Sequence, residues 1–272
     1  MTAVLHLAAF AAYVTAWGLQ LRGFKGAGPV RSAPAVAALS VGAVSHLGGL
    51  AAFAGAHETM PLVGLGPASS SLAFVIALVV LAASVRSETR PAGLFLLPVV
   101  LVLLAEALYV GVRPTPRQTA FRGPWFVLHV GSTFSGYAGL LLASAASAMY
   151  LFQFRALKRK KFGSVFRFFP PLEALDRLSR SGLYFGFPAL TLGLLLGWSW
   201  TLTYGGSGLA LGSPEVLFGI VTWLAYLVAL FMRTAPGGRG ERAAAVSTGA
   251  FVITLAVFLA LRFTVSASGF FI

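Results

Sequence analysis

The sequence predicts an all-α membrane protein, a polytopic bundle of eight transmembrane helices with both termini outside the cytoplasm. Three observations lead to this prediction: the composition, the recurrence of long apolar runs and the uneven placement of basic residues. Of the 272 residues, 58% are hydrophobic and only 10% are charged, whereas a soluble domain carries about 25% charged residues. The composition therefore excludes an ordinary soluble domain.

Apolar runs long enough to cross a bilayer, about 20 residues each, recur along the whole chain. We expect eight spans, over residues 3–21, 33–55, 68–85, 91–112, 124–152, 182–204, 214–232 and 243–264. Few residues remain outside them, so we expect a single integral membrane domain over residues 1–272. The first span has no basic residue before it and no small-residue cleavage site, which argues against a signal peptide.

Basic residues lie mainly on one side of the predicted membrane. Sixteen of the twenty Lys and Arg residues follow spans one, three, five and seven, and they include the "KRKK" run at residues 158–161. Because basic residues collect on the cytoplasmic face, both termini should lie outside. The run is then a topology signal that also touches anionic lipid headgroups. Since topology accounts for the net charge of +13, we expect no nucleic-acid partner.

The sequence lacks cysteine and a nucleotide-binding loop and is rich in glycine, and each of these features limits which functions we expect. The chain has no cysteine, which excludes disulfides and thiolate metal ligands. It has no Gly-rich nucleotide-binding loop followed by Lys and Ser or Thr, so we do not expect it to hydrolyse ATP. Its 31 glycines indicate close helix packing, because small residues let membrane helices approach one another.

Ionisable side chains inside the spans are the candidate functional residues, because charge in hydrocarbon is costly. They are His6, His46, Glu106 and His129. His6 lies near the outer end of the first span, and we expect it to be an interfacial histidine in contact with water. We expect Glu106 to be protonated or paired with Arg113. We place His57 in the outer loop after span two.

His46 and His129 lie deeper, and small residues follow each of them: Gly48 and Gly49 in one span, Gly131, Ser132, Ser135 and Gly136 in the other. Such a surface accepts either a neighbouring helix or a flat ligand. At ~1.5 Å per residue the two histidines lie about 13 and about 7 Å below the outer ends of their spans, which is a similar depth within boundary error. Two opposed imidazoles can hold a haem iron. The alternative, which spacing alone favours, is a hydrogen bond from each histidine to a carbonyl or a serine of the next helix.

Several motifs accumulate in the second half of the chain. They are "LDRLS" (175–179), "GFPALTLGLLLGWSW" (186–200), "TWLAYL" (222–227), Arg233 and "GGRGERAA" (237–244). Span five adds His129, a "GY" pair ending eight residues later and a "YLFQFRALKRKK" exit, and His46 stands in "HLGGLA". Together these motifs resemble the cytochrome c assembly membrane proteins, the CcsA, ResC and CcmC group, and especially its HemX-like branch. The likeness covers about residues 40–262 and is strongest over 124–250.

The resemblance implies a haem-binding or haem-handling protein of cytochrome c biogenesis in the bacterial inner (cytoplasmic) membrane. It implies binding of haem b without covalent attachment, and no enzymatic activity. The implied iron ligands are His129 and, opposite it, His46, while Trp198 and Trp200 are what remains of a Trp-rich haem-handling segment. The implied partners are membrane lipids and other membrane subunits or haem-pathway proteins.

The chain also departs from the family pattern. Ser213 stands where an Asp is expected, Gly212 where a Trp is expected, and Phe231 where a His is expected; the C-terminal "TVSASGFFI" lacks a further His. Of the family's haem-ligating set only His129 keeps its position. The alternative is therefore a HemX-type accessory scaffold that regulates haem synthesis through a cytoplasmic partner, such as glutamyl-tRNA reductase, at the basic 155–180 segment. A structural subunit of a larger respiratory complex is a further alternative.

Overall fold

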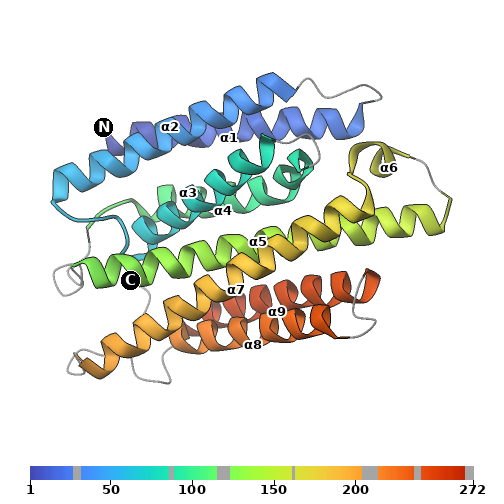
Figure 1. The fold of residues 1–272 in the computed structure, drawn as a ribbon. Helices are drawn as coiled ribbons and strands as arrows, with labels where there is room; N and C mark the ends of the chain where they lie inside the picture. The colour runs from blue at the N-terminus through green and yellow to red at the C-terminus, as the bar shows by residue number, and fades with distance from the viewer. Residues whose placement is uncertain are drawn as a thin grey trace. The chain divides into compact units, whose positions relative to one another are not determined.

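The structure is a computed structural model that describes residues 1–26, 32–85, 89–114, 123–160, 163–203, 214–235 and 240–266. In these ranges the chain is helical and contains no strand (Figure 1). The elements are α1 (Thr2–Lys25), α2 (Ser32–His57), α3 (Leu65–Ser84), the 3-10 helix η1 (Arg90–Ala92), α4 (Gly93–Val110), α5 (Pro124–Lys158), α6 (Ser164–Phe168), α7 (Leu172–Thr203), α8 (Pro214–Thr234) and α9 (Glu241–Ser266).

Among the described residues, eight helices are long and apolar enough to cross a membrane. The prediction of an all-α, eight-span membrane protein is therefore confirmed, although α5 continues to Lys158 and α7 begins at Leu172 rather than near residue 182. Both extensions have local causes. Basic side chains in the last turn of α5 favour the helix dipole, and Asp176 pairs with Arg180 one turn later in α7.

Two segments that were expected to be loops are partly helical. Residues Ser164–Phe168 form the short helix α6. His57 is the last residue of α2 instead of an outer-loop residue, and its ring lies 4.7 Å from that of Phe53, centroid to centroid. That aromatic contact, one turn apart on the same helix face, extends α2 beyond the expected end at residue 55.

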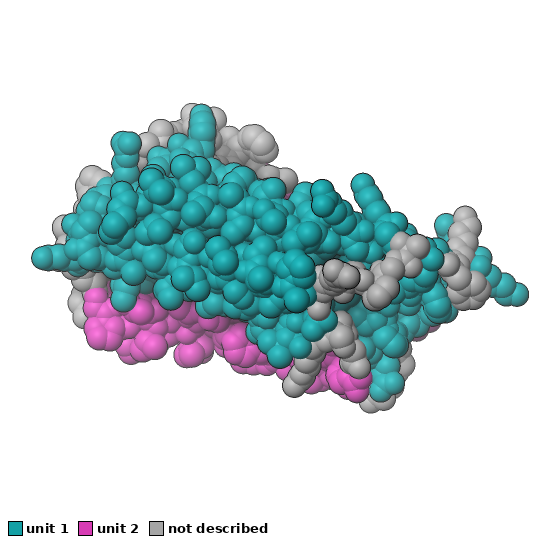
Figure 2. Space-filling view, turned by 90° about the horizontal axis from the view of Figure 1, so that it is seen from above, with its two compact units in different colours: residues 1–122, 152–174 teal, residues 123–151, 175–272 magenta. Residues whose placement is uncertain are grey.

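The chain divides into two compact units (Figure 2). Unit 1 comprises residues 1–122 and 152–174, and unit 2 comprises residues 123–151 and 175–272. The N-terminal part of α5 and most of α7 thus belong to unit 2. The single integral membrane domain over residues 1–272 stays a prediction.

In unit 1, α1 packs against α2 and α4, and α3 packs against α4 and α2. The buried face of α1 repeats at intervals of three and four residues: His6, Ala9, Tyr13, Ala16 and Gln20. This spacing places all of them on one side of the helix. Glycines of α2 receive the two rings, since a Cβ at Gly42 would lie 2.6 Å from Tyr13 and one at Gly49 would lie 2.6 Å from His6.

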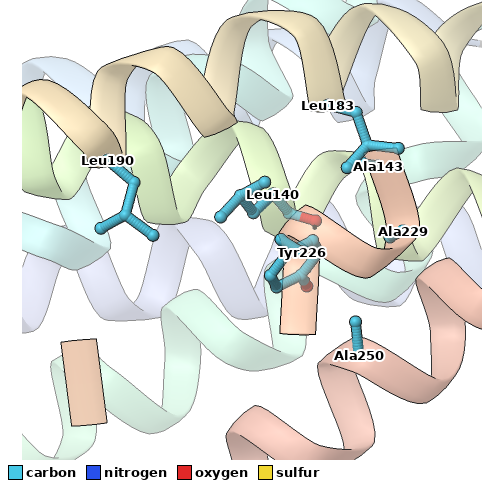
Figure 3. Close-up of a cluster of buried hydrophobic side chains, with 7 residues drawn as sticks. All are labelled: Leu140, Ala143, Leu183, Leu190, Tyr226, Ala229 and Ala250. Atoms are coloured by element: carbon cyan, nitrogen blue, oxygen red, sulfur yellow. Dashed lines mark hydrogen bonds between the residues drawn. The ribbon is translucent and has the colours of Figure 1, made fainter. Parts of the chain in front are cut away.

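In unit 2, the core joins four helices around a cluster of buried side chains: Leu140, Ala143, Leu183, Leu190, Tyr226, Ala229 and Ala250 (Figure 3). Helices α5 and α7 approach at backbone distance on one side of this cluster. A Cβ at Gly139 would lie 2.8 Å from the Cα of Gly186, and a Cβ at Gly136 would lie 2.7 Å from the nitrogen of Leu190. Only small residues allow such an approach, so the smooth surface after His129 accepts a neighbouring helix.

Candidate functional site

His129 lies in unit 2, five residues after the first residue of α5, and is half-buried. Its ring packs over the backbone of α7, where a Cβ at Gly197 would lie 2.7 Å from the imidazole Cε1. The ring Nδ1 lies 2.7 Å from the carbonyl oxygen of Gly193. Gly197 therefore leaves room for this imidazole, and Gly193, one turn earlier, supplies the carbonyl that accepts its hydrogen bond; together they form its seat on α7.

The hydrogen bond to Gly193 determines which nitrogen of His129 carries the proton. A carbonyl oxygen only accepts, so a neutral His129 must donate from Nδ1. The Nε2 lone pair is then available, and Nε2 has no hydrogen-bond partner among the described residues. Metal-ligating histidines typically donate their other ring nitrogen to a backbone carbonyl in this way, because the bond fixes both tautomer and ring orientation. The same bond is also the hydrogen bond to a carbonyl of the next helix that the structural alternative predicted for His129, so the role of its second nitrogen stays a prediction.

Aromatic side chains lie on the same stretch of the two helices. Trp125, one turn before His129, donates its indole N–H to the carbonyl oxygen of Leu196 over 3.2 Å. On α7, Trp198 is half exposed and Trp200 is less so. Trp198 and Trp200 were predicted from the sequence and Trp125 was not, although its position one turn before the histidine was an available signal.

His46 and His6 come together in unit 1, around one serine of α3. Both imidazole rings are fully buried, with centroids 5.3 Å apart. The Nε2 of His6 lies 2.8 Å from Ser70 Oγ, and the Nε2 of His46 lies 3.0 Å from the same atom. The expectation that His6 reaches water at the interface is wrong. Its ring enters the space left by Gly49 on the facing helix α2, and this helix separates the ring from the water at the outer end of α1.

The hydrogen-bond partners of the two rings determine which nitrogen of each imidazole carries the proton. His6 Nδ1 donates to the carbonyl oxygen of Thr2 over 2.8 Å, so its Nε2 must accept from the Ser70 hydroxyl. The Ser70 oxygen then accepts from His46 Nε2–H. His46 Nδ1 is left to accept from the hydroxyl of Tyr13 over 3.3 Å. Every ring nitrogen in the cluster is used. The bond from His46 to Ser70 is of the kind that the structural alternative predicted, from a histidine to a serine of the next helix.

The residues fit a haem iron differently in the two units. In unit 2, His129 keeps one nitrogen lone pair free of hydrogen bonds. In unit 1, His46 has both nitrogens bonded and the ring of His6 in edge contact with its own. His46 would have to give up its bond to Ser70 before it could bind iron. The pairing of His46 with His129 on one iron, and the haem-binding roles of Trp198 and Trp200, stay predictions.

Ser69, the neighbour of Ser70, donates to the Glu106 carboxylate over 2.8 Å. Glu106 is thus part of the polar interior of unit 1. Apart from these contacts, the parts of the chain that the structure describes contain no group of three or more His, Cys, Asp or Glu side chains arranged to hold a metal ion.

Two of the motifs singled out in the sequence meet in unit 2. Asp176 of "LDRLS" lies 2.8 Å from Arg233, whose side chain is only 5% exposed. Arg233 also donates to Ser179 over 2.6 Å, and Ser179 shares a 2.7 Å hydrogen bond with Ser147 of α5. This network joins α5, α7 and α8, so the motif residues here have a structural role. Nothing in the pattern of either motif had indicated that they meet.

Comparisons with known proteins identify relatives of most of this chain. A family model described as "Cytochrome C assembly protein" matches residues 57–266. A protein named "Cytochrome c biogenesis protein CcsA" from Prochlorococcus marinus (strain MIT 9312) is 32% identical over 165 residues, which are 53% of this chain and 52% of the relative. The protein of the same name from Guillardia theta is 28% identical over 166 residues, 56% of this chain and 55% of the relative. The chain spans about half the length of the curated relatives it matches.

Proposed function

The chain belongs to the cytochrome C assembly protein family, and we propose that it binds or handles haem b as part of cytochrome c biogenesis. It acts by binding, without making or breaking covalent bonds itself. It lies in the inner (cytoplasmic) membrane of a bacterium, with membrane lipids and other membrane subunits or haem-pathway proteins as partners. We assign it to the HemX-like branch of the family, because only Trp198 and Trp200 remain of the Trp-rich segment.

The observation that carries this proposal is the hydrogen bond from His129 to Gly193. It leaves the Nε2 lone pair for iron and prevents the ring from turning. Haem supplies an iron that accepts a neutral imidazole as an axial ligand. Trp125 and Trp198, each at least 44% exposed, offer aromatic surface on the two helices that hold the histidine.

Absorption spectroscopy of the purified full-length protein tests the proposal. After growth with excess haem precursor, the wild-type protein should show a Soret band, and His129→Ala should abolish or strongly shift it while the protein still inserts. His129→Gln is the sharper variant, because its amide can still donate to the Gly193 carbonyl but supplies no imidazole. A colourless wild-type preparation would overturn the proposal.

His57 provides the matched control for these variants. It is an exposed histidine at the end of α2, so His57→Ala removes an imidazole without touching the seat on α7. We expect its Soret band to equal that of the wild type. His46→Ala should convert a six-coordinate spectrum to a five-coordinate one if His46 is the second ligand, and should leave the spectrum unchanged if His46 of the wild-type protein stays bonded to Ser70 instead of to iron.

A regulatory scaffold is the second candidate function, and the basic end of α5 favours it. Arg155, Lys158, Arg159 and Lys160 are all exposed; Lys161 lies outside the described residues. Replacing residues 158–161 by Gln should weaken binding to an acidic partner or anionic vesicles by about 1 kcal/mol per charge. Unchanged co-purification and unchanged vesicle binding at low salt would leave the run as a topology signal only.

The expected topology belongs to the same proposal. Both termini lie outside, and the segment after α5 lies in the cytoplasm, because basic residues collect there. Reporter fusions after residue 161 and after residue 272 should therefore report opposite sides of the membrane. Two fusions on the same side would contradict this arrangement.

A further inference from the structure

The end of unit 1 at which α1 and α5 finish carries a dense group of basic side chains around the short helix α6. Seven of them are exposed: Arg22, Lys25, Arg155, Lys158, Arg159, Lys160 and Arg167. The residues that the structure describes at this end of unit 1 include one acidic side chain, Glu173, in the first turn of α7. We propose that Arg22, Lys25 and Arg167 form a binding site for the headgroup phosphate of an anionic phospholipid. This site gives a chemical class to the membrane lipids proposed above as partners, and it rests on that proposal.

Aromatic contacts hold α6 against the membrane helices of unit 1. The ring of Phe168, the last residue of α6, lies 5.4 Å from that of Phe24 on α1, centroid to centroid, in an edge-to-face contact. The next residue, Phe169, stacks on Phe24 at 5.9 Å and lies 5.9 Å from the ring of Phe95 on α4. Such ring pairs stabilise a contact beyond the area that they bury. Because a helix of five residues is not stable alone, these rings determine where α6 lies.

The same contacts bring three cations from two elements together. Arg22 and Lys25 lie in the last turn of α1, on either side of Phe24 in the sequence, and residues three apart on a helix are neighbours on its surface. Arg167 directly precedes Phe168, and the Cα atoms of α1 and α6 come within 8 Å of one another. The guanidinium groups and the ammonium group of these exposed residues can therefore converge on one anion.

Exposed aromatic rings beside the cations favour a lipid over an acidic protein. Phe166 of α6 is 37% exposed, and Phe152 of α5 is 48% exposed. The ring of Phe152 stacks on that of Phe95 at 6.2 Å, which places it in the same aromatic group. Helices α1, α4 and α5 are each apolar enough to cross the membrane, so this end of unit 1 lies where acyl chains meet headgroups. A segment with cations and phenylalanine rings on different sides is suited to that boundary.

The charge of this surface selects the class of lipid. A guanidinium group binds a phosphate through two parallel hydrogen bonds, and an ammonium group adds a point charge. Each Lys or Arg near the membrane increases the affinity for anionic lipid by about fivefold. A zwitterionic lipid carries its own ammonium group, which these cations repel, so the site should discriminate against it. The basic end of α5 adds to the attraction from outside the site.

Native mass spectrometry of the purified full-length protein in detergent tests this proposal, with phosphatidylglycerol and phosphatidylcholine as the two probes. The wild-type protein should bind phosphatidylglycerol at least about tenfold more tightly than phosphatidylcholine. Arg22→Gln/Lys25→Gln and Arg167→Gln should each lower the affinity for phosphatidylglycerol by at least about fivefold and leave that for phosphatidylcholine unchanged. Equal affinities of the wild-type protein for the two lipids would overturn the site, and this comparison needs no variant to insert.

Two matched variants separate a built site from diffuse surface charge. Phe168→Ala changes no charge but removes the ring that holds α6 on α1, so it should lower the affinity for phosphatidylglycerol about as much as Arg167→Gln does. Arg242→Gln removes one exposed cation from α9 in unit 2 and should leave that affinity unchanged. Equal losses in Arg242→Gln and Arg167→Gln, or no loss in Phe168→Ala, would overturn the site in favour of diffuse attraction. Displacement of the lipid by an equal concentration of inorganic phosphate would overturn the choice of a lipid.

Haem binding and lipid binding have separate readouts. Arg22→Gln/Lys25→Gln should keep the Soret band expected of the wild-type protein, because His129 and its seat are untouched. His129→Ala should keep the preference for phosphatidylglycerol, whatever its effect on haem. A colourless wild-type protein that prefers phosphatidylglycerol would therefore contradict the haem proposal alone, and a protein with a Soret band but no lipid preference would contradict the lipid site alone.

Discussion

His129 in unit 2 and His46 in unit 1 have the same surroundings in the sequence, a deep position in an apolar span with small residues after it. Their hydrogen bonds differ. Among the described residues His129 has one hydrogen-bond partner, a backbone carbonyl, which leaves one nitrogen lone pair without a hydrogen bond. His46 has two partners, both hydroxyls, and uses both nitrogens.

The hydrogen-bond partner of a membrane histidine, more than its depth in the span, therefore decides which of its nitrogens can bind something else. A carbonyl accepts only, so it fixes the tautomer and leaves the other nitrogen as a ligand. A serine hydroxyl both donates and accepts, and it therefore links two imidazoles into a closed network. The first arrangement leaves one ring nitrogen without a hydrogen bond, and the second uses both nitrogens of His46.

The largest effect should come from the backbone contact that supports His129. Gly186→Leu adds a side chain whose Cβ alone would lie 2.7 Å from the nitrogen of Leu140. Overpacking of this kind should reduce the free energy of unfolding by about 3 kcal/mol, and the Soret band should be lost with it. Thermal unfolding of the purified protein measures the first effect. Gly131→Leu, with nothing within 4 Å of its Cβ, should change neither.

A smaller loss should follow from closing the space for His6 in unit 1. In Gly49→Ala the new Cβ would lie 2.6 Å from His6 Nδ1, so the ring must shift, and we expect a cost of about 1–2 kcal/mol. Because the seat of His129 is untouched, the Soret band should stay. Gly55→Ala on the same helix has open space and is the control. A lost Soret band in Gly49→Ala would mean that the histidine cluster takes part in haem binding.

Removing the shared hydroxyl should have a still smaller effect. Ser70→Ala leaves His6 Nε2 and His46 Nε2 without their common partner. Interhelical hydrogen bonds in membranes contribute about 0.6 kcal/mol on average, so we expect a loss of about 1 kcal/mol in thermal unfolding experiments. A loss of unfolding free energy several times larger would show that the two imidazoles do not replace the serine by a hydrogen bond to each other.

The smallest effect should come from Tyr13→Phe. The hydroxyl of Tyr13 makes a long hydrogen bond of 3.3 Å to His46, while its ring fills the space beside Gly42. Phenylalanine keeps the ring, so the free energy of unfolding should fall by about 0.5 kcal/mol or less. Tyr13→Ala is the comparison, since it also removes the ring and should cost several times more.

Hydropathy and length were sufficient to predict the number of membrane helices, because apolar runs of this length can satisfy their backbone in lipid only as helices. The ends of these helices were harder to predict. The first ten residues of α7 contain Asp176 and three other charged residues, and the helix there depends on side-chain pairs that hydropathy does not detect.

The candidate site was predictable in part. His129 could be predicted as a candidate from its position in the span and from its motif. Its seat on α7 could not, because every residue has a backbone carbonyl and the sequence does not show that the carbonyl of Gly193 is the acceptor. The glycines at 193 and 197, one turn apart, were the available signal. His6 was misplaced because its partner Ser70 lies 64 residues away in the chain, and nearness to a helix end is no guide to burial when a facing helix covers that end.

The glycines opposite α1 also fix how far that helix can slide. Three polar side chains spaced seven residues apart each face a glycine: His6 faces Gly49, Tyr13 faces Gly42 and Gln20 faces Gly93. Lipid gives no hydrophobic attraction between helices that could select a register, so steric exclusion selects it here. A shift by one turn would bring each side chain against a residue that has a Cβ. The two residues of each pair must therefore vary together: a larger residue at position 49 is acceptable only with a smaller one at position 6.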